Sequence, residues 1–599
     1  MKRNIWAFFL IAMFFVISAQ VPAQVPQPAP TATPITPTGQ EDLKNELDQL
    51  KKMVKLLEDR LAAQEAKQAT TVATPAAEAK TETETQLKEL DRRVTKTERD
   101  TSLQRLRFGG DYRFEAHSIR STSPAHYDGM KLQSLVVRSM FVMGILGRPP
   151  MSINEINNTV AANYGSYQYF TSNLTFDQLR QQMATFPPAM QQQLMGMLMP
   201  ATYVPETKGN NAILYTNRFR FRIDAPVADN LSFSARLSMY KVFGDSTGVQ
   251  VFNGQPNTLN IDGTTSGVPN SDQLRVERAY FTWNKIGGSN FFLSIGRRPS
   301  TNGPPLNYRQ DEMRAGTPSG ALIDYQFDGI TFGYNVSEKT ILRFCYGLGY
   351  ESGFGNGELL KMPADRLKDV HFLGGNFDIW SSENMLIQAT VARAFDVTDG
   401  FNGLTVLPNN PLTGEPVGAP LVMRFTPSTN VGSINLAGLT ITRKIRRLDL
   451  FASVNYVGMR PNGATTPFGG MMSDPFETPV NRDGAMFYVG ARYNFGTEER
   501  TKIGFEFNHG TKYWFNFAQA EDDIIAPKTN TRGEVYEGYV LHRINNRFTI
   551  KGSYINYNYR YSGSGWHLGA PKDLTLTPIL GFPTFKDAQM LTISTIVRF

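Results

Sequence analysis

Short segments in which apolar and polar side chains alternate strictly recur along most of the chain, and this pattern constrains the fold more than any other feature. An extended strand sends successive side chains to opposite faces, so each segment has one apolar and one polar face. The apolar faces are rich in aromatic residues and the polar faces in arginine, as in Tyr215, Phe219, Phe221 and Ile223 against Arg218, Arg220 and Arg222. One face therefore suits lipid and the other suits water.

Segments of this kind, roughly ten residues each, number about sixteen. A soluble sandwich would also alternate, but the repetition and the aromatic share of 12% favour a membrane barrel. The expected strands cover residues 106–117, 214–224, 231–241, 274–284, 290–297, 321–335, 340–350, 368–380, 385–395, 432–442, 447–458, 484–496, 501–509, 533–543, 547–560 and 588–599.

The connections between these segments are alternately short and long. Short polar turns such as 225–230, 337–340 and 496–500 alternate with long stretches rich in Gly, Pro and Asn. Membrane barrels have short periplasmic turns and long external loops, which produces this asymmetry. We therefore predict an all-β transmembrane antiparallel β-barrel of about 16 strands. It covers residues 105–599, and both of its ends lie on the periplasmic side.

The N-terminus has the pattern of an export signal. Lys2 and Arg3 precede an apolar run that ends at Ile17, and Ala19 or Ala23 offers a small residue for cleavage. We therefore assign residues 1–23 to a signal peptide, with an uncleaved single-helix anchor as the alternative. No Cys stands directly after the apolar run, which excludes lipoprotein processing. No later apolar run is long enough to span a membrane.

Residues 24–40 are rich in Pro, Thr and Ala and predict an extended linker. The next segment, residues 41–104, predicts an α-helical coiled coil with a break near residues 69–85. Its apolar residues recur at alternating steps of three and four: Leu43, Leu47, Leu50, Val54, Leu57 and Leu61. A narrow stripe on a charged helix favours self-association, most simply as a trimer or an antiparallel hairpin, and the alternative is a helix folded on its own barrel.

The composition excludes several classes of site. Cys345 is the only cysteine, so there is no disulfide framework and no paired-cysteine metal motif. The histidines form no His-Glu-x-x-His motif, and no nucleophile and base stand together on neighbouring strands. We therefore expect no cofactor, no metal site and no catalytic residue, so the chain is not an enzyme. The formal net charge is +7. Binding of nucleic acid, contact with anionic lipopolysaccharide or an anion-attracting pore would each explain this basic excess, and the charge alone does not distinguish them.

One connection, residues 118–211, is too long for a plain loop. It contains the apolar stretch 135–146 and the Gln- and Met-rich stretch 176–199, which predicts helix. Such an insertion would plug the barrel, cover its mouth or pack against a neighbouring subunit.

The chain closes with an alternating strand that ends in Phe599. A final strand with a terminal Phe resembles the assembly signal of Gram-negative outer-membrane barrels. Signal, coiled coil and barrel together resemble the phosphate-selective and related stalked porins. The resemblance implies the outer membrane of a Gram-negative bacterium, with the N-terminal stalk in the periplasm. The partners it implies are outer-membrane lipid and lipopolysaccharide, the barrel-assembly machinery, a homotrimer through the coiled coil and peptidoglycan, with no nucleic acid.

Charges on the strands must point inward, because an arginine on the lipid face near the midplane costs about 2 to 4 kcal/mol. The expected pore-lining residues are Arg113, Arg218, Arg220, Arg222, Arg236, Arg278 and Arg492. Arginines outnumber acids on these faces, which favours anions, although pairing with lumen carboxylates would cancel that preference.

The third external loop should follow the fifth strand, and in sixteen-stranded porins that loop folds inward to form the constriction. Here the corresponding charged residues are Arg297, Arg298, Arg309, Asp311, Glu312 and Arg314. We expect Asp311 and Glu312 to face the wall of Arg218, Arg220 and Arg222 across the narrowest point, with an ordinary external loop as the alternative.

The sequence thus predicts an outer-membrane porin, a passive diffusion channel for small hydrophilic solutes with a mild anion preference. The alternative from another class is a barrel scaffold or sheath that holds a periplasmic or extracellular partner, such as a multihaem cytochrome.

Overall fold

The computed structural model divides the chain into two units, residues 1–104 and 105–599. The residues that the structure describes are 48–49, 51–60, 62, 89–91, 106–244, 250–251, 269, 271–326, 328–355, 359–362, 367–399, 403–406, 422–425, 427–518, 523–581 and 584–599. The predicted signal peptide and linker lie outside these residues. Within the predicted coiled coil, residues 51–60 are helical.

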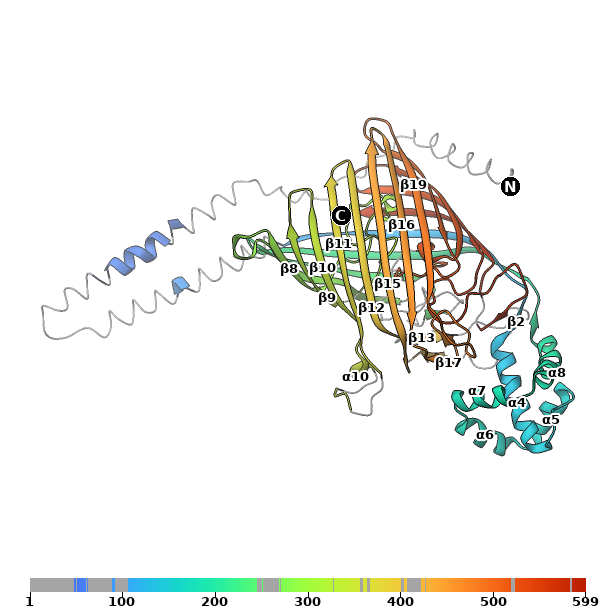
Figure 1. The fold of residues 1–599 in the computed structure, drawn as a ribbon. Coiled ribbons are helices and arrows are strands. Elements are labelled where there is room, and N and C mark those ends of the chain that lie inside the picture. Colours follow the sequence, from blue (N-terminus) through green and yellow to red (C-terminus); the bar gives the residue numbers. More distant parts are fainter. Residues whose placement is uncertain are drawn as a thin grey trace, which may run out of the picture. The chain divides into compact units, whose positions relative to one another are not determined.

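The second unit is built on one closed β-barrel of sixteen antiparallel strands (Figure 1). In chain order these strands are β1 (Arg107–Ser123), β4 (Thr207–Ala228), β5 (Leu231–Val242), β7 (Ser271–Trp283), β8 (Phe291–Arg297), β9 (Asp328–Asn335), β10 (Ile341–Tyr350), β11 (Val370–Ser382), β12 (Met385–Thr398), β15 (Asn430–Ile445), β16 (Leu448–Pro461), β19 (Arg482–Phe495), β20 (Thr501–Gly510), β21 (Gly533–Arg543), β22 (Phe548–Tyr559) and β24 (Asp587–Arg598).

The first and last barrel strands lie side by side. β1 pairs with β24 through Tyr112 and Val597, and with β4 through Tyr112 and Phe219. Every other barrel strand pairs with the barrel strands next to it along the chain, so the barrel is a simple up-and-down meander. The sequence prediction of a sixteen-stranded antiparallel barrel is confirmed.

Short and long connections segregate to opposite ends of the barrel. Seven turns of two to seven residues join β4–β5, β7–β8, β9–β10, β11–β12, β15–β16, β19–β20 and β21–β22 at one end, which we call the short-turn rim. β1 begins and β24 ends at this rim. The long connections, among them 124–206, 298–327 and 511–532, all leave the opposite end.

The alternation in sequence becomes a difference between the two faces of the wall. Large apolar side chains are exposed on the outside, and most inward positions are polar or charged and buried. The exposed set includes Phe108, Phe233, Phe281, Phe332, Phe344, Leu373, Val391, Leu439, Ile441, Val454, Phe487, Val489, Ile503, Phe505, Tyr536, Leu591 and Ile593. An apolar outer band around a polar interior is the arrangement of a barrel that spans a membrane.

All sixteen expected strands are present, but some ends differ, since β4 begins at Thr207 and not at residue 214, and one segment was wrongly assigned to a strand. The strand expected from residue 321 begins at Asp328, and residues 321–326 belong to the preceding loop. Ala321 and Leu322 are completely buried inside the barrel, together with loop residues from elsewhere in the chain. Their apolar character reflects burial in the lumen, which a strand-length apolar run cannot distinguish from a lipid-facing strand.

The long insertion between β1 and β4 forms a small helical subdomain. It contains β2 (His126–Asp128), α4 (Gly129–Leu146), α5 (Ile153–Ala162), α6 (Tyr164–Asn173), α7 (Phe176–Thr185), α8 (Pro188–Leu198), η2 (Met199–Thr202) and β3 (Tyr203–Val204). The side chains of Asp128, Ser152 and Thr175 cap α4, α5 and α7. The stretch 176–199, which we expected to be helical, forms α7 and α8 with a break at Phe186 and Pro187, and the apolar stretch 135–146 belongs to α4.

Helix α4 is long and apolar enough to cross a membrane by length and composition, so the expectation of no such segment after the leader was wrong. Its buried residues, such as Leu135 and Phe141, pack with Leu179 of α7 and Leu198 of α8 in a core of their own. The helix is thus the centre of the subdomain. Strand β2 also pairs with β23 (Ile579–Leu580), which ties the subdomain to the last long loop.

The remaining elements are short and lie in connections. They are β6 (Gln250–Val251), η4 (Ile286–Gly288), α9 (Asn307–Gln310), α10 (Ser352–Gly355), β13 (Gly403–Val406), β14 (Val422–Phe425), β17 (Thr465–Thr466), β18 (Gly469–Gly470) and η5 (Lys528–Asn530).

Candidate functional site

The site is built by the loop between the fifth and sixth barrel strands, which folds into the barrel. We call residues 298–326 the inward loop; it contains α9. Tyr308 stacks on Phe451 of β16, with 5.7 Å between ring centroids, and Ile323 forms a β-bridge with Phe517 of the β20–β21 loop. Because β16 lies far around the barrel from β8, the loop crosses the lumen.

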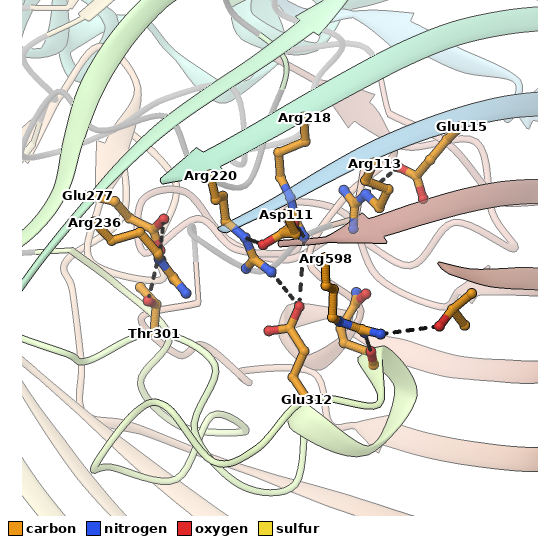
Figure 2. Close-up of polar contacts among 12 residues, drawn as sticks. Asp111, Arg113, Glu115, Arg218, Arg220, Arg236, Glu277, Thr301, Glu312 and Arg598 are labelled. Atoms are coloured by element: carbon orange, nitrogen blue, oxygen red, sulfur yellow. Dashed lines mark hydrogen bonds and ion pairs between the residues drawn. The ribbon is translucent and has the colours of Figure 1, made fainter. Parts of the chain in front are cut away.

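One side of the loop tip contacts a basic wall. The carboxylate of Glu312 forms an ion pair with Arg220 of β4 and lies 3.8 Å from the guanidinium of Arg218 (Figure 2). Asp111 of β1 lies on the same two arginines, 2.7 Å from Arg220 and 3.2 Å from Arg218. Two carboxylates therefore compensate two buried guanidinium groups, and Figure 2 shows all four side chains converging.

The other side of the tip contacts the far wall. Asp311 lies 3.1 Å from the guanidinium of Arg492 on β19 and 2.6 Å from the ammonium of Lys502 on β20. The same Arg492 lies 2.9 Å from Asp449 of β16. Asp311 and Glu312 are neighbours in sequence, yet their carboxylates contact different parts of the wall.

A third contact joins the inward loop to the β20–β21 loop. Arg309 lies 2.8 Å from Asp523 of that loop and 3.1 Å from Glu537 of β21. Lys528, also from the β20–β21 loop, forms ion pairs with Glu506 of β20 and with Glu537. Both loops are thus tied to the same wall by buried charges.

Further charges secure the base of the inward loop. Asp378 of β11 lies 3.0 Å from Arg314 and 2.9 Å from Arg343 of β10. Arg278 of β7 donates to the carbonyl oxygen of Thr301 at 2.9 Å. Arg236 of β5 donates to Glu277 of β7 at 2.7 Å.

Arg298 differs from these arginines. Its side chain is buried to 8% exposure, and its guanidinium lies over the ring of Tyr280 at 5.7 Å. Within the described part of the chain, no carboxylate lies within ion-pair distance of it. A buried guanidinium without a counterion favours a mobile anion nearby.

Burial and pairing act in opposite directions on the loop carboxyls. Burial raises the pKa of Asp311 and Glu312, but Lys502 and Arg492 outweigh it at Asp311, and Arg220 and Arg218 outweigh it at Glu312, so both pKa values lie below the usual range. Asp324 is different, because burial raises its pKa to about 7 and the hydrogen bond from Asn302 only partly offsets this.

A small pocket of about 30 Å³ lies beside the loop tip. It is lined by Arg113, His117, Arg309, Lys551 and Glu537 among others. That volume holds a few water molecules. The pocket beside the loop tip is therefore small and lined mainly by polar and charged side chains.

The structure places the predicted site residues as follows. Arg113, Arg218, Arg220, Arg236, Arg278 and Arg492 are inside the barrel and mostly buried, whereas the side chain of Arg222 is 59% exposed and pairs with Asp224 at 2.9 Å. Arg297 ends β8 and lies 3.4 Å from Asp328. Arg298, Arg309, Asp311, Glu312 and Arg314 all belong to the inward loop. Only Glu312, Arg218 and Arg220 meet as expected, since Asp311 and Arg222 have other partners.

Several residues of the site were not expected from sequence. Glu277 is the extra residue of a bulge, because Arg236 pairs with Arg278 and Leu237 with Val276. Glu277 and Arg278 are therefore both buried in the interior although they are adjacent. Asp523 and Lys528 lie in a loop, where no periodicity marks them. Lys502 stands on the polar face of an alternating segment and could have been found that way. Among the described residues, no group of three or more His, Cys, Asp or Glu side chains could hold a metal ion.

Comparison with solved structures returns bacterial outer-membrane proteins at low similarity. An anion-selective porin from Comamonas acidovorans is 8% identical, with 82% of this chain and 99% of that chain covered and a TM-score of 0.38. Outer-membrane expressed OmpT of Vibrio cholerae and the outer membrane channel DcaP of Acinetobacter baumannii are each 10% identical, with coverage of 82% and 97% and a TM-score of 0.34. These values carry no argument about function.

No curated protein matches the sequence at a significant level. The porin-type architecture therefore rests on this chain itself, on sixteen antiparallel strands in closed order and a third long loop folded into the lumen. A family comparison covers most of the barrel, residues 208–599. The chain belongs to the family described as "Protein of unknown function (DUF3373)".

Proposed function

We propose that this protein is an outer-membrane channel of restricted bore that passes small hydrophilic solutes. The observation that carries the proposal is the barrel itself, with an apolar exterior around a charged interior into which the inward loop folds. Rings of fixed charge at a narrow point set which ions pass. The contacts of Glu312, Arg309 and Asp311 with three different parts of the wall support a fixed constriction.

We further propose a mild anion preference. Most lumen arginines have carboxylate partners, as Arg220 has with Asp111 and Arg314 with Asp378, so they contribute little net field. Arg298 differs, because no carboxylate of the described residues pairs with it, and it supplies an uncompensated positive charge at the base of the inward loop.

The segment ahead of the barrel and the termini fit the same proposal. We assign residues 1–23 to export and residues 41–104 to a periplasmic stalk that self-associates or contacts peptidoglycan. The short-turn rim would face the periplasm, since short turns mark that side in outer-membrane barrels. Phe599 would act as the assembly signal.

A second candidate is a scaffold that holds a partner, and one observation favours it. Leu322 of the inward loop and Trp514 of the β20–β21 loop are completely buried in an apolar cluster within the barrel, and the fully buried Arg532 lies beside Trp514. A lumen packed in this way leaves less room for solutes than one lined only by charges. This reading predicts little conductance.

Planar-bilayer recording of the purified barrel distinguishes the two. The channel proposal predicts stable conductance steps and a reversal potential in a salt gradient that indicates anions. Arg298→Gln should lower the anion-to-cation permeability ratio, whereas Arg222→Gln, at an exposed and paired arginine, should leave it unchanged. A correctly inserted but silent barrel would overturn the channel proposal in favour of the scaffold.

A further inference from the structure

The short-turn rim carries an arc of basic residues between β15 and β24. The turn between β15 and β16 contains Arg446 and Arg447, the turn between β19 and β20 ends at Arg500, and the turn between β21 and β22 ends at Arg547. Backbone hydrogen bonds connect adjacent turns and strands: the carbonyl of Arg447 accepts from the amide of Asn494 at 2.8 Å, that of Arg500 from Arg543 at 2.8 Å and that of Arg547 from Arg598 at 2.7 Å. These residues therefore form one continuous arc from β15 to β24.

The acidic residues of this arc form ion pairs with other basic residues of the arc. Glu499 lies 2.9 Å from the ammonium of Lys444, and Glu498 lies 2.5 Å from the guanidinium of Arg500. The side chains of Arg443, Arg446 and Arg447 are exposed and, within the described ranges, form no ion pair. Three adjacent guanidinium groups thus have no counterion from the protein.

Arg443 is also on the lipid-facing side of the wall. Its neighbours on that face of β15 are Ile441 and Ile445, which are 39% and 47% exposed. Across the sheet it pairs with Met385 of β12 and Leu450 of β16. An arginine on an apolar face is tolerated near the membrane interface only when its long side chain carries the charge to the surface.

Aromatic residues mark the level of that interface. Tyr493 and Phe495 of β19 are both exposed on the outside, with ring centroids 4.7 Å apart. Tyr493 pairs with Leu448 of β16, the residue directly after the turn. Tyrosine in this position is typical of the boundary between the hydrocarbon region and the headgroups. The three arginines therefore lie at the depth of the lipid phosphates.

We infer that Arg443, Arg446 and Arg447 bind the phosphate of an anionic phospholipid in the leaflet at the short-turn rim. Guanidinium groups suit phosphate because they donate two parallel hydrogen bonds. An acyl chain would lie on Ile441, Ile445 and Leu450, which a free phosphate ion could not use. The inference rests on the proposed membrane location but not on conduction.

The test measures lipid retention by the full-length protein in native mass spectrometry. The protein is inserted into nanodiscs that contain equal amounts of phosphatidylglycerol and phosphatidylcholine with matched chains. The wild type should retain phosphatidylglycerol preferentially, and the triple variant R443Q/R446Q/R447Q should lose that preference by about tenfold or more. Arg393→Gln is the matched control, because Arg393 is also outward-facing but lies nearer the other end of the barrel.

Each outcome decides a different point. Equal retention of phosphatidylglycerol by the wild type and the triple variant would overturn the site. If excess inorganic phosphate stripped the lipid completely, the ligand would be a free anion and the lipid assignment would be wrong. The triple variant should keep the conductance of the wild type. A wild-type barrel that retains phosphatidylglycerol but does not conduct would contradict the channel proposal and leave the lipid site intact.

Discussion

The guanidinium of Arg309 lies 3.1 Å from the carboxylate of Glu537, on the far side of the barrel from the strands that the inward loop connects. Both side chains are almost completely buried. Asp523 lies on the same guanidinium at 2.8 Å, so one buried cation joins two loops to the wall. Removing one member of such a cluster leaves a buried charge without a partner. The loss of stability is then larger than the net stabilisation that the intact cluster provides.

Arg309→Met should therefore release the tip of the inward loop. The substitution keeps an unbranched apolar stem but removes the guanidinium and leaves Asp523 without this partner, at a local cost of about 3 kcal/mol. We expect a larger and noisier single-channel conductance and faster proteolysis within residues 298–326. Arg222→Met, at the exposed mouth, should change neither. A released loop with unchanged conductance would show that the loop does not limit flow.

Arg532→Ala should loosen the long loops and spare the barrel. Arg532 is completely buried and donates to the carbonyl oxygens of Trp514, Ser562 and Trp566. Burial lowers its pKa to about 9. Alanine leaves three buried carbonyls without donors, at about 3 kcal/mol or more. Hydrogen exchange should rise across residues 511–518, 523–532 and 560–572, while the unheated protein keeps the gel mobility of a folded barrel.

The control for this prediction is Arg560→Ala. Arg560 pairs with Glu534, but its side chain is 62% exposed. An exposed pair contributes little, so exchange in the same loops should stay as in the wild type. Equal effects of the two substitutions would contradict the role of Arg532 in holding the loops together.

Asp324→Asn should remove a pH dependence of the inward loop. The unfolded carboxyl ionises above a pKa of about 4, whereas in the folded loop burial holds the pKa at about 7. The folded state binds more protons within this window, so the stability of the loop falls as the pH rises from about 4 to about 7. Asparagine should abolish the fall and slow hydrogen exchange of residues 300–326 at pH 8, by up to about 4 kcal/mol in opening free energy.

Asp311→Asn is the matched control, with the opposite sign. The pKa of Asp311 is below its usual range, so its contribution is present above the unfolded pKa and is lost as the pH falls through the folded value. Removing its charge should therefore speed exchange of the same loop at pH 7. If the two substitutions had the same effect at pH 7 to 8, the assignment of opposite pKa shifts would be wrong.

The barrel could be predicted from sequence because lipid and water impose a period of two on every strand. Phe487 and Val489 face lipid and Tyr488 faces the interior for that reason, and the pattern repeats through all sixteen strands. The prediction failed where the interior is itself apolar. Leu322 and Ile323 are buried inside the barrel, and residues at such positions are apolar. The apolar run around them was therefore mistaken for part of a strand, which begins only at Asp328.

Only the part of the site that depends on the order of the strands could be predicted from the sequence. Counting strands identified the loop that folds inward and its charged residues. The partners of Asp311 and Glu312 depend on the path of that loop, and the inward position of Glu277 depends on a bulge. Neither leaves a periodic signal in the sequence.

Gly110 and Phe599 allow a test of how the barrel closes. The two residues exchange backbone hydrogen bonds of 2.9 and 3.1 Å, and the ring of Phe599 stacks on Phe219 with centroids 6.3 Å apart. A Cβ atom on Gly110 would lie 2.3 Å from the carbonyl oxygen of Arg220 and 2.8 Å from the Phe599 ring. Only glycine therefore leaves room for the terminal ring at the seam between β1, β4 and β24.

Gly110→Val should impair assembly as Phe599→Ala does, although it leaves the terminal residue in place. The displaced ring and backbone should destabilise the seam by about 3 kcal/mol, and the fraction of barrel that resists unfolding in unheated gels should drop for both variants. Gly538→Val is the control, because a Cβ atom at Gly538 meets nothing within 4 Å. If Gly110→Val assembled normally while Phe599→Ala did not, the terminal residue would act through recognition during assembly and its packing at the seam would be dispensable.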